Sequence, residues 1–291
     1  IILNSKLKQV MKKLHFKLFK RLSCIVVFTT LFFSHVQAKG INDAIQLPDF
    51  KSGKTIWVIR AGVGFNGFTG SNIETTKLQW ENNDWNGSFG KATGYEFTLG
   101  FNKSFGNHPL YWGMELGMAS RGYTSSSSWE KSGSSAISGG TDYHGKFQDE
   151  SMLCHTVKFS PFTIGYRYTF LEKMAADIHL GAYASYDIAG KYKRDYTDHI
   201  ISTSKYGNRN DKTTSSTETK IKDYDNMKRY DAGINLGIGY WFGKFNIDFT
   251  WQRGFIAIFE GRNELVKIGK ESRKRGNLFT NNFQLKLGYA F

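Results

Sequence analysis

The sequence predicts an all-β protein, an eight-stranded antiparallel up-and-down transmembrane β-barrel. Three observations lead to this prediction. Apolar and polar residues alternate with a period of two in segments along the whole chain, which is the pattern of β-strands. Long and short connections between these segments also alternate, and the N-terminus has the features of an export signal.

The composition disfavours several other classes of protein. Aromatic residues make up 16% of the chain and 31 of its 291 residues are glycine, whereas hydrophobic residues reach only 40%. A multi-helix membrane protein needs several apolar runs of about 20 residues, and a disordered chain is poor in aromatics. With 2 cysteines the chain is no disulfide scaffold, and no Cys/His cluster suggests zinc.

Residues 1–38 are predicted to comprise a few upstream residues and a cleaved signal peptide. Residues 1–10 precede the first methionine, and basic residues then lead into an apolar stretch over residues 22–33. The small residues Val36 and Ala38 place the cleavage point after Ala38. A transmembrane helix is the alternative, but the apolar stretch is short for one.

Export would also change the charge of the chain. Residues 1–38 hold seven basic residues and no acidic ones, so the net charge falls from +14 to about +7. Much of the basicity therefore belongs to the signal, and we expect no nucleic-acid partner. Cys154 would remain as the lone cysteine, and we expect it to be buried or lipid-facing rather than catalytic.

The first four strands follow a short periplasmic segment predicted over residues 39–54. Aromatic residues mark the strand ends, with Trp57 in the first strand, Phe105 in the second and Trp112 in the third. The fourth strand changes phase, which predicts a β-bulge near Ser160-Pro161 because proline is tolerated there. We predict these four strands over residues 55–67, 91–105, 109–122 and 151–169.

The last four strands show the alternation most cleanly. In the terminal strand, the apolar positions Phe283, Leu285 and Leu287 alternate with polar or small residues up to Phe291. We predict these strands over residues 174–190, 227–242, 244–257 and 278–291. The barrel domain is therefore predicted over residues 55–291.

The connections fall into two kinds. Tight turns are predicted over residues 106–108 and 171–173 and at Gly243. The long connections are polar, rich in Ser, Thr and Gly, and we expect them to be flexible loops on the outer side of the membrane. They cover residues 68–90, 123–150, 191–226 and 258–277.

A membrane barrel explains these features better than a soluble β-sandwich. Period-two alternation alone fits both, because the two folds only exchange the faces of their strands. The export signal, the length of the strands and the aromatic residues clustered near strand ends favour the membrane. A bilayer also requires a closed sheet, since an open edge would leave backbone groups unpaired in hydrocarbon.

The chain resembles the small outer-membrane β-barrel proteins of Gram-negative bacteria, of the OmpA/OmpX-like kind. The resemblance rests on the alternating end of the chain and on residues 162–168, which are similar to a middle strand of Bacteroidetes-type barrels. It implies that the last strand is a signal read by the barrel-assembly machinery. The residues of this signal would be Phe283, Leu285, Leu287, Tyr289 and Phe291.

The predicted lumen face carries many charged residues. Buried charges need partners, so we expect a crossed ion-pair network that fills the barrel, since eight strands leave little room inside. A narrow ion path or a proton relay is the alternative. The predicted network comprises Arg60, Glu96, Glu115, Arg121, Arg167, Asp177, His179, Asp187, Asp231, Asp248 and Lys286.

We predict no catalytic residue, metal site or cofactor. Residues 62–67 match G-x-G-x-x-G, but a loop rather than a phosphate-binding helix is expected to follow, so the match is accidental. Asp142, His144, Asp198 and His199 lie on predicted outer loops and could in principle activate water, as in outer-membrane hydrolases. The H-x-S motif of lipid A deacylases is missing, however, and we expect the protein not to be an enzyme.

The expected function is a structural or interaction role through the outer loops. A small porin-like pore is the second hypothesis, and a hydrolase sited on the loops is the third. Trp80, Trp85 and Trp129 are candidate contacts for an unidentified loop partner. Basic clusters are candidate contacts for lipopolysaccharide phosphates, at Lys191, Lys193, Arg194, Lys267, Lys270, Arg273, Lys274 and Arg275.

Processing of the N-terminus is the first testable prediction. The purified protein should begin at Lys39, because the small residues before it form the signal peptidase site. Intact-mass measurement of protein from the outer membrane checks this. A mature species that retains residues 22–33 would refute the assignment.

Overall fold

The computed structural model describes residues 44–134, 141–204, 207–224, 227–259, 265–268, 271–274 and 276–291. The predicted signal peptide, residues 1–38, lies outside these described residues. No helix among them is long and apolar enough to cross a membrane.

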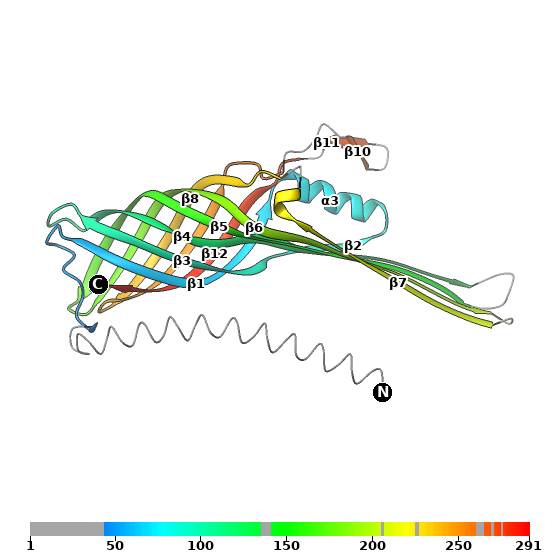
Figure 1. Ribbon diagram of the computed structural model, residues 1–291, viewed down its shortest axis with the longest axis horizontal. Helices are drawn as coiled ribbons and strands as arrows, with labels where there is room; N and C mark the ends of the chain where they lie inside the picture. Colours follow the sequence, from blue (N-terminus) through cyan, green and yellow to red (C-terminus); the bar gives the residue numbers. More distant parts are fainter. Residues whose placement is uncertain are drawn as a thin grey trace.

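Eight strands form a closed antiparallel ring, as predicted (Figure 1). The last strand pairs with the first over Val58↔Ala290 to Thr69↔Phe279, and this pairing closes the barrel. The ring follows chain order: β1 (Thr55–Thr69), β3 (Ala92–Ser104), β4 (Leu110–Ser134), β5 (Thr141–Leu171), β6 (Met174–Ser204), β8 (Tyr230–Phe242), β9 (Phe245–Gly254) and β12 (Phe279–Ala290).

The two faces of the barrel are inverted relative to a water-soluble protein. Large apolar side chains point outward and stay exposed, including Leu116 at 57% and Leu287 at 60%, whereas charged and amide side chains fill the interior. A continuous apolar outer surface needs lipid to cover it. Two of the aromatic residues predicted near strand ends, Trp57 and Phe105, are likewise exposed on the outer surface.

The predicted bulge near Ser160-Pro161 is confirmed. Phe159 pairs with Ala184 and Phe162 with Ala182, so β5 holds one residue more than β6 over this step. The extra residue returns apolar side chains to the lipid face and explains the change of phase.

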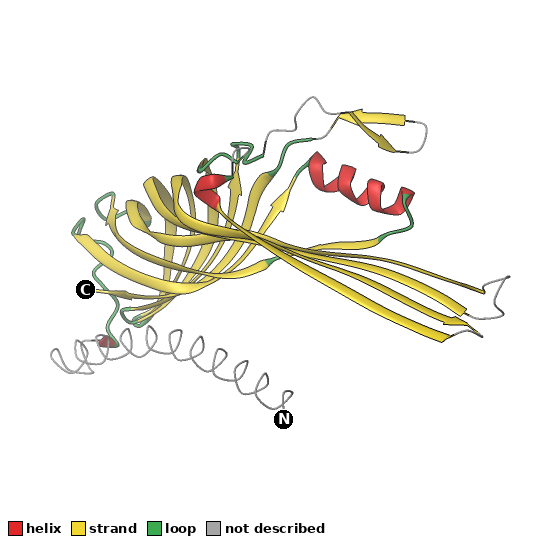
Figure 2. Ribbon diagram, turned by 45° about the vertical axis from the view of Figure 1, so that its right-hand side comes forward, coloured by secondary structure: helices red, strands yellow, loops and turns green. Residues whose placement is uncertain are grey.

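The prediction of flexible loops over residues 123–150 and 191–226 is wrong for most of their length. There β4, β5 and β6 continue beyond the barrel as paired strands, and β7 (Gly207–Lys220) pairs with β6 (Figures 1 and 2). We call this sheet the β extension: residues 123–134 of β4, 141–152 of β5, 191–204 of β6, and β7. Its Ser- and Thr-rich strands are polar on both faces, so they lack the apolar period that marks a membrane strand.

Two further connections also contain regular structure that the sequence analysis missed. Helix α3 (Ser71–Asn82) and strand β2 (Asn86–Gly90) lie within the predicted loop 68–90, and β2 pairs with the β4 edge. Trp80 of α3 stacks on Phe89 of β2 at 5.1 Å between ring centroids. The predicted loop 258–277 contains the short antiparallel hairpin β10 (Leu265–Ile268) and β11 (Glu271–Lys274).

The position of helix α3 corrects the prediction about the segment that follows the glycine motif. A helix does begin shortly after residues 62–67, not the loop that was predicted. The motif nevertheless lies inside the membrane strand β1. At Gly62 a Cβ would come within 2.1 Å of the Leu285 carbonyl oxygen, so close contact between β1 and β12 requires glycine there.

Hydrogen exchange tests the β extension. Residues 192–203 of β6 pair with β5 on one side and β7 on the other, so their amides should exchange slowly. Alternate amides of the edge strand β7 should exchange faster and provide an internal comparison. Mass spectrometry of the detergent-solubilised protein measures both segments, and fast exchange throughout residues 192–203 would show that this region is a loop after all.

Candidate functional site

The centre of the lumen holds a chain of ion pairs between strands that are distant in the sequence. Lys286 lies opposite Asp248 in the β12–β9 register and contacts it at 3.0 Å. Lys286 also lies 3.7 Å from Glu96, which accepts a hydrogen bond of 2.5 Å from Lys158. These side chains are almost fully buried, so each charge depends on its partners rather than on water.

Three further ion pairs, formed by two arginines, flank this chain. Arg60 of β1 donates to Glu115 of β4, across the strand β3 that separates them. Nearer the outer end, Arg121 Nε donates to Asp187 Oδ1 at 2.8 Å and Arg121 Nη1 lies 3.9 Å from Asp231. The Asp187 side chain is completely buried and also accepts from the Thr156 hydroxyl.

Asp177 gathers a second set of partners near the short-turn end. Its carboxylate accepts hydrogen bonds from Tyr111 Oη at 3.0 Å and Trp241 Nε1 at 2.5 Å, and lies 3.6 Å from Arg167 Nε. The ring of His179 bridges two carboxylates, with Nδ1 3.0 Å from Asp177 and Nε2 3.4 Å from Asp248.

The described lumen combines five Lys and Arg side chains and His179 with six carboxylates. All eleven residues predicted from the sequence lie in this lumen. The cation that the prediction missed is Lys158, although Val157 and Phe159 point outward and the alternation of β5 therefore places Lys158 inside.

Apolar clusters lie at both ends of the lumen. Towards the short turns, Phe50 packs edge-on against Trp241 at 5.3 Å and covers the Arg167 guanidinium at 3.9 Å. This cluster is completed by Ile56, Val58, Ala175 and Ala290. At the end that continues into the β extension, a second cluster comprises Met152, Cys154, Tyr192, Ile221, Met227 and Ile258. Cys154 is fully buried there, in agreement with expectation.

The candidate hydrolase residues do not converge on one site. His144 Nε2 lies 2.7 Å from Asp198 and its ring packs edge-on against Trp129. His199 bonds instead to Asn210, on the opposite face of the β extension, and Asp142 accepts from Ser202. Within the described residues, no group of three or more His, Cys, Asp or Glu side chains is placed to hold a metal ion.

Three of the predicted lipopolysaccharide contacts are already paired within the β extension. Lys191 donates to Glu218 at 2.5 Å, Arg194 donates to Glu150 at 2.8 Å, and Lys193 bonds to Asp195.

In two of these pairs, the partner shifts the pKa of a charged group. Partial burial disfavours the charge of Arg194, but the Glu150 carboxylate outweighs this and raises the pKa of Arg194. The hydrogen bond from Lys193 lowers the pKa of Asp195.

The other predicted lipopolysaccharide contacts belong to the sequence of the β10–β11 hairpin and its flanking residues. The backbone of Lys267 belongs to β10, and the backbones of Arg273 and Lys274 belong to β11. Their side chains, together with Lys270 and Arg275, lie outside the described residues.

The terminal strand presents its predicted assembly residues on the lipid side. Leu285, Leu287 and Phe291 are 45% to 60% exposed, whereas Tyr289 is covered and packs against Phe245. Phe283 stacks on Phe249 of β9. The backbone N–H of Phe291 donates to the Trp57 carbonyl at 3.0 Å, which ties the chain end to β1.

Comparison with known proteins identifies the family. Residues 49–260 match the family described as Outer membrane protein beta-barrel domain, and the chain belongs to this family. The protein is therefore an integral β-barrel of the bacterial outer membrane. None of the curated proteins matches the chain.

Solved structures with a similar arrangement are outer-membrane barrels. The attachment invasion locus protein Ail of Yersinia pestis, solved with the heparin analogue sucrose octasulfate, is 14% identical, with 82% of this chain and 99% of Ail covered and a TM-score of 0.31. Neisserial surface protein A is 10% identical, with coverages of 81% and 97% and a TM-score of 0.30. The N-terminal barrel of Pseudomonas aeruginosa OprF is 8% identical, with coverages of 80% and 97% and a TM-score of 0.21.

The lumen pairs can be tested by removing one charge. Glu96→Gln leaves Lys158 and Lys286 without their shared carboxylate, and we expect a loss of about 3–5 kcal/mol in the free energy of unfolding. Denaturant unfolding of the refolded barrel measures it. Glu172→Gln, in the exposed turn between β5 and β6, is the matched control and should have little effect.

A double variant separates pairing from packing. Glu96→Leu combined with Lys158→Leu removes both charges, so it should be less destabilising than Glu96→Leu alone. Equal stability of the wild type and Glu96→Gln would mean that the two lysines do not depend on this carboxylate.

Proposed function

We propose that the protein is a non-conducting outer-membrane barrel whose role is structural or interactive, with the β extension as its partner surface. The observation that carries the proposal is the filled lumen. Paired charges occupy its centre, and apolar clusters built around Trp241 and Tyr192 cover its two ends. A conducting pore needs a continuous wet path, which this packing disfavours.

The β extension supports the interaction half of the proposal. In the described residues β7 pairs only with β6, so its other edge offers backbone N–H and C=O groups to a partner. Trp129 is partly exposed on this sheet, with Lys146 over its ring at 5.6 Å, and is a candidate contact. Trp80 is less available because it packs on Phe89.

The proposal includes no catalytic role. A hydrolase would need His144, Asp198 and a third group around one substrate, but His199 lies on the other face of the sheet. Attraction of lipopolysaccharide to the predicted basic clusters remains part of the proposal, although Lys191 and Arg194 are engaged in ion pairs.

Conductance tests the closed lumen. In planar bilayers the folded protein should show no large, stable channel, because the ion pairs around Lys286 fill the cross-section. A known porin reconstituted in the same way controls for insertion. A steady open channel from correctly folded protein would favour the pore hypothesis.

The terminal strand is proposed to be the signal for the barrel-assembly machinery. Deleting Phe291 removes the terminal aromatic and its backbone bond to Trp57, so less folded, heat-modifiable barrel should reach the outer membrane. Phe255→Ala, which removes another exposed aromatic at the opposite end of the barrel, is the control. Equal assembly of the deletion variant and the wild type at native expression would contradict the proposal.

A further inference from the structure

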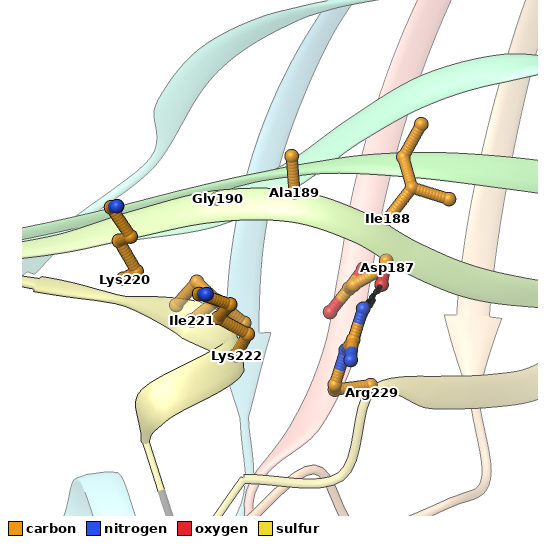
Figure 3. Close-up of a pocket in the computed structure, with 8 residues that line it drawn as sticks. All are labelled: Asp187, Ile188, Ala189, Gly190, Lys220, Ile221, Lys222 and Arg229. Atoms are coloured by element: carbon orange, nitrogen blue, oxygen red, sulfur yellow. Dashed lines mark hydrogen bonds between the residues drawn. The ribbon is translucent and has the colours of Figure 1, made fainter.

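A small pocket lies where β6 leaves the barrel and enters the β extension. It has a volume of about 130 Å³ and is lined by the end of β7 and the two residues after it, by Arg229, and by residues 187–190 of β6. Figure 3 shows Lys220, Ile221 and Lys222 on one side of the pocket and Asp187 and Arg229 on the other. The β5–β6 register shifts beside this point, because His155 pairs with Ala189 and Thr156 with Asp187, so Ile188 is the extra residue of a β-bulge.

Three cations line this pocket. Arg229 is held in place because its Nε and Nη2 donate to the Asp187 carbonyl at 3.1 and 2.7 Å, and its guanidinium lies over the Tyr186 ring. Lys220 and Lys222 are exposed. Across the part of the chain that the structure describes, none of these three cations forms an ion pair with a carboxylate.

The one acidic residue in the lining, Asp187, does not neutralise the pocket. Asp187 contributes its backbone to the lining, but its side chain is completely buried and bonded to Arg121 and Thr156. The residues that line the pocket therefore carry more positive than negative charge. The cations of the pocket differ from Lys191 and Arg194, which form ion pairs with Glu218 and Glu150.

The surroundings place the pocket at the boundary between membrane and water. Tyr186, Ile188 and Tyr230 are 48% to 50% exposed on the lipid-facing surface beside it. Tyrosines in this position mark the headgroup level of a bilayer. At Gly190 a Cβ would come within 2.7 Å of Ile221, so glycine keeps the floor of the pocket open.

We propose that this pocket binds the phosphate of a phosphorylated glycolipid in the outer leaflet. Lys220, Lys222 and Arg229 supply the charge and the hydrogen-bond donors that a phosphate needs, and Ile188 and Tyr230 supply an apolar path for the acyl chains. The inference rests on the outer-membrane location and is independent of any partner of the β extension.

Binding of phosphorylated lipid A to the folded full-length barrel in zwitterionic detergent tests the site. Native mass spectrometry measures the bound fraction across a titration. Lys220→Gln combined with Lys222→Gln should weaken binding roughly tenfold or more, since each removes a charge near the phosphate. Lys51→Gln combined with Lys54→Gln, two exposed lysines at the short-turn end, is the matched control and should bind like the wild type.

Two further binding measurements test whether the pocket recognises the phosphate of a lipid. The wild type should bind dephosphorylated lipid A weakly. Its affinity for this lipid should be no higher than the affinity of the Lys220 and Lys222 double variant for phosphorylated lipid A. Inorganic phosphate at equal concentration should not displace the lipid, because it lacks the acyl chains.

Three outcomes would overturn the proposal. These are wild-type affinity in the Lys220 and Lys222 double variant, an equal loss in the Lys51 and Lys54 control, or full displacement by inorganic phosphate. Both double variants change only exposed side chains outside the lumen, so both should fold. Heat-modifiability measured in the same preparations verifies this.

Discussion

The ion pairs of the lumen are the interaction on which the rest of the structure depends. A closed barrel in lipid turns its apolar side chains outward, so its polar side chains must satisfy one another inside. Arg60 reaches Glu115 across an intervening strand, and Lys158 reaches Glu96 in the same way. Such pairs form only in one register, because a slip of one residue would turn Lys286 towards lipid.

The filled interior is the basis of our proposal that this barrel does not conduct, so a role in binding would lie with its extended end. The cluster around Met152 and Ile258 covers the lumen just where β4, β5 and β6 continue into the β extension. Long paired strands present their side chains on a firmer surface than loops of the same composition would. The basic pocket beside Asp187 lies next to the register shift between β5 and β6, where β6 enters the β extension.

The barrel could be predicted from the sequence because lipid imposes a period of two on each membrane strand. The same alternation identified eleven lumen residues and could have identified Lys158. The partners within the network could not be predicted, because they depend on how strands cross the interior. The β extension and helix α3 were missed for a different reason: strands exposed to water on both faces, such as β7, leave no apolar period.

Solvent access to the lumen tests the central claim most directly. Thr98 is 1% exposed inside the barrel, whereas Ser132 is exposed on the β extension. In a background where Cys154 is replaced by Ala, the folded Thr98→Cys variant should not react with a small charged thiol reagent, and Ser132→Cys should react quickly. Rapid modification of Thr98→Cys in the folded barrel would show a wet, open interior and contradict the account.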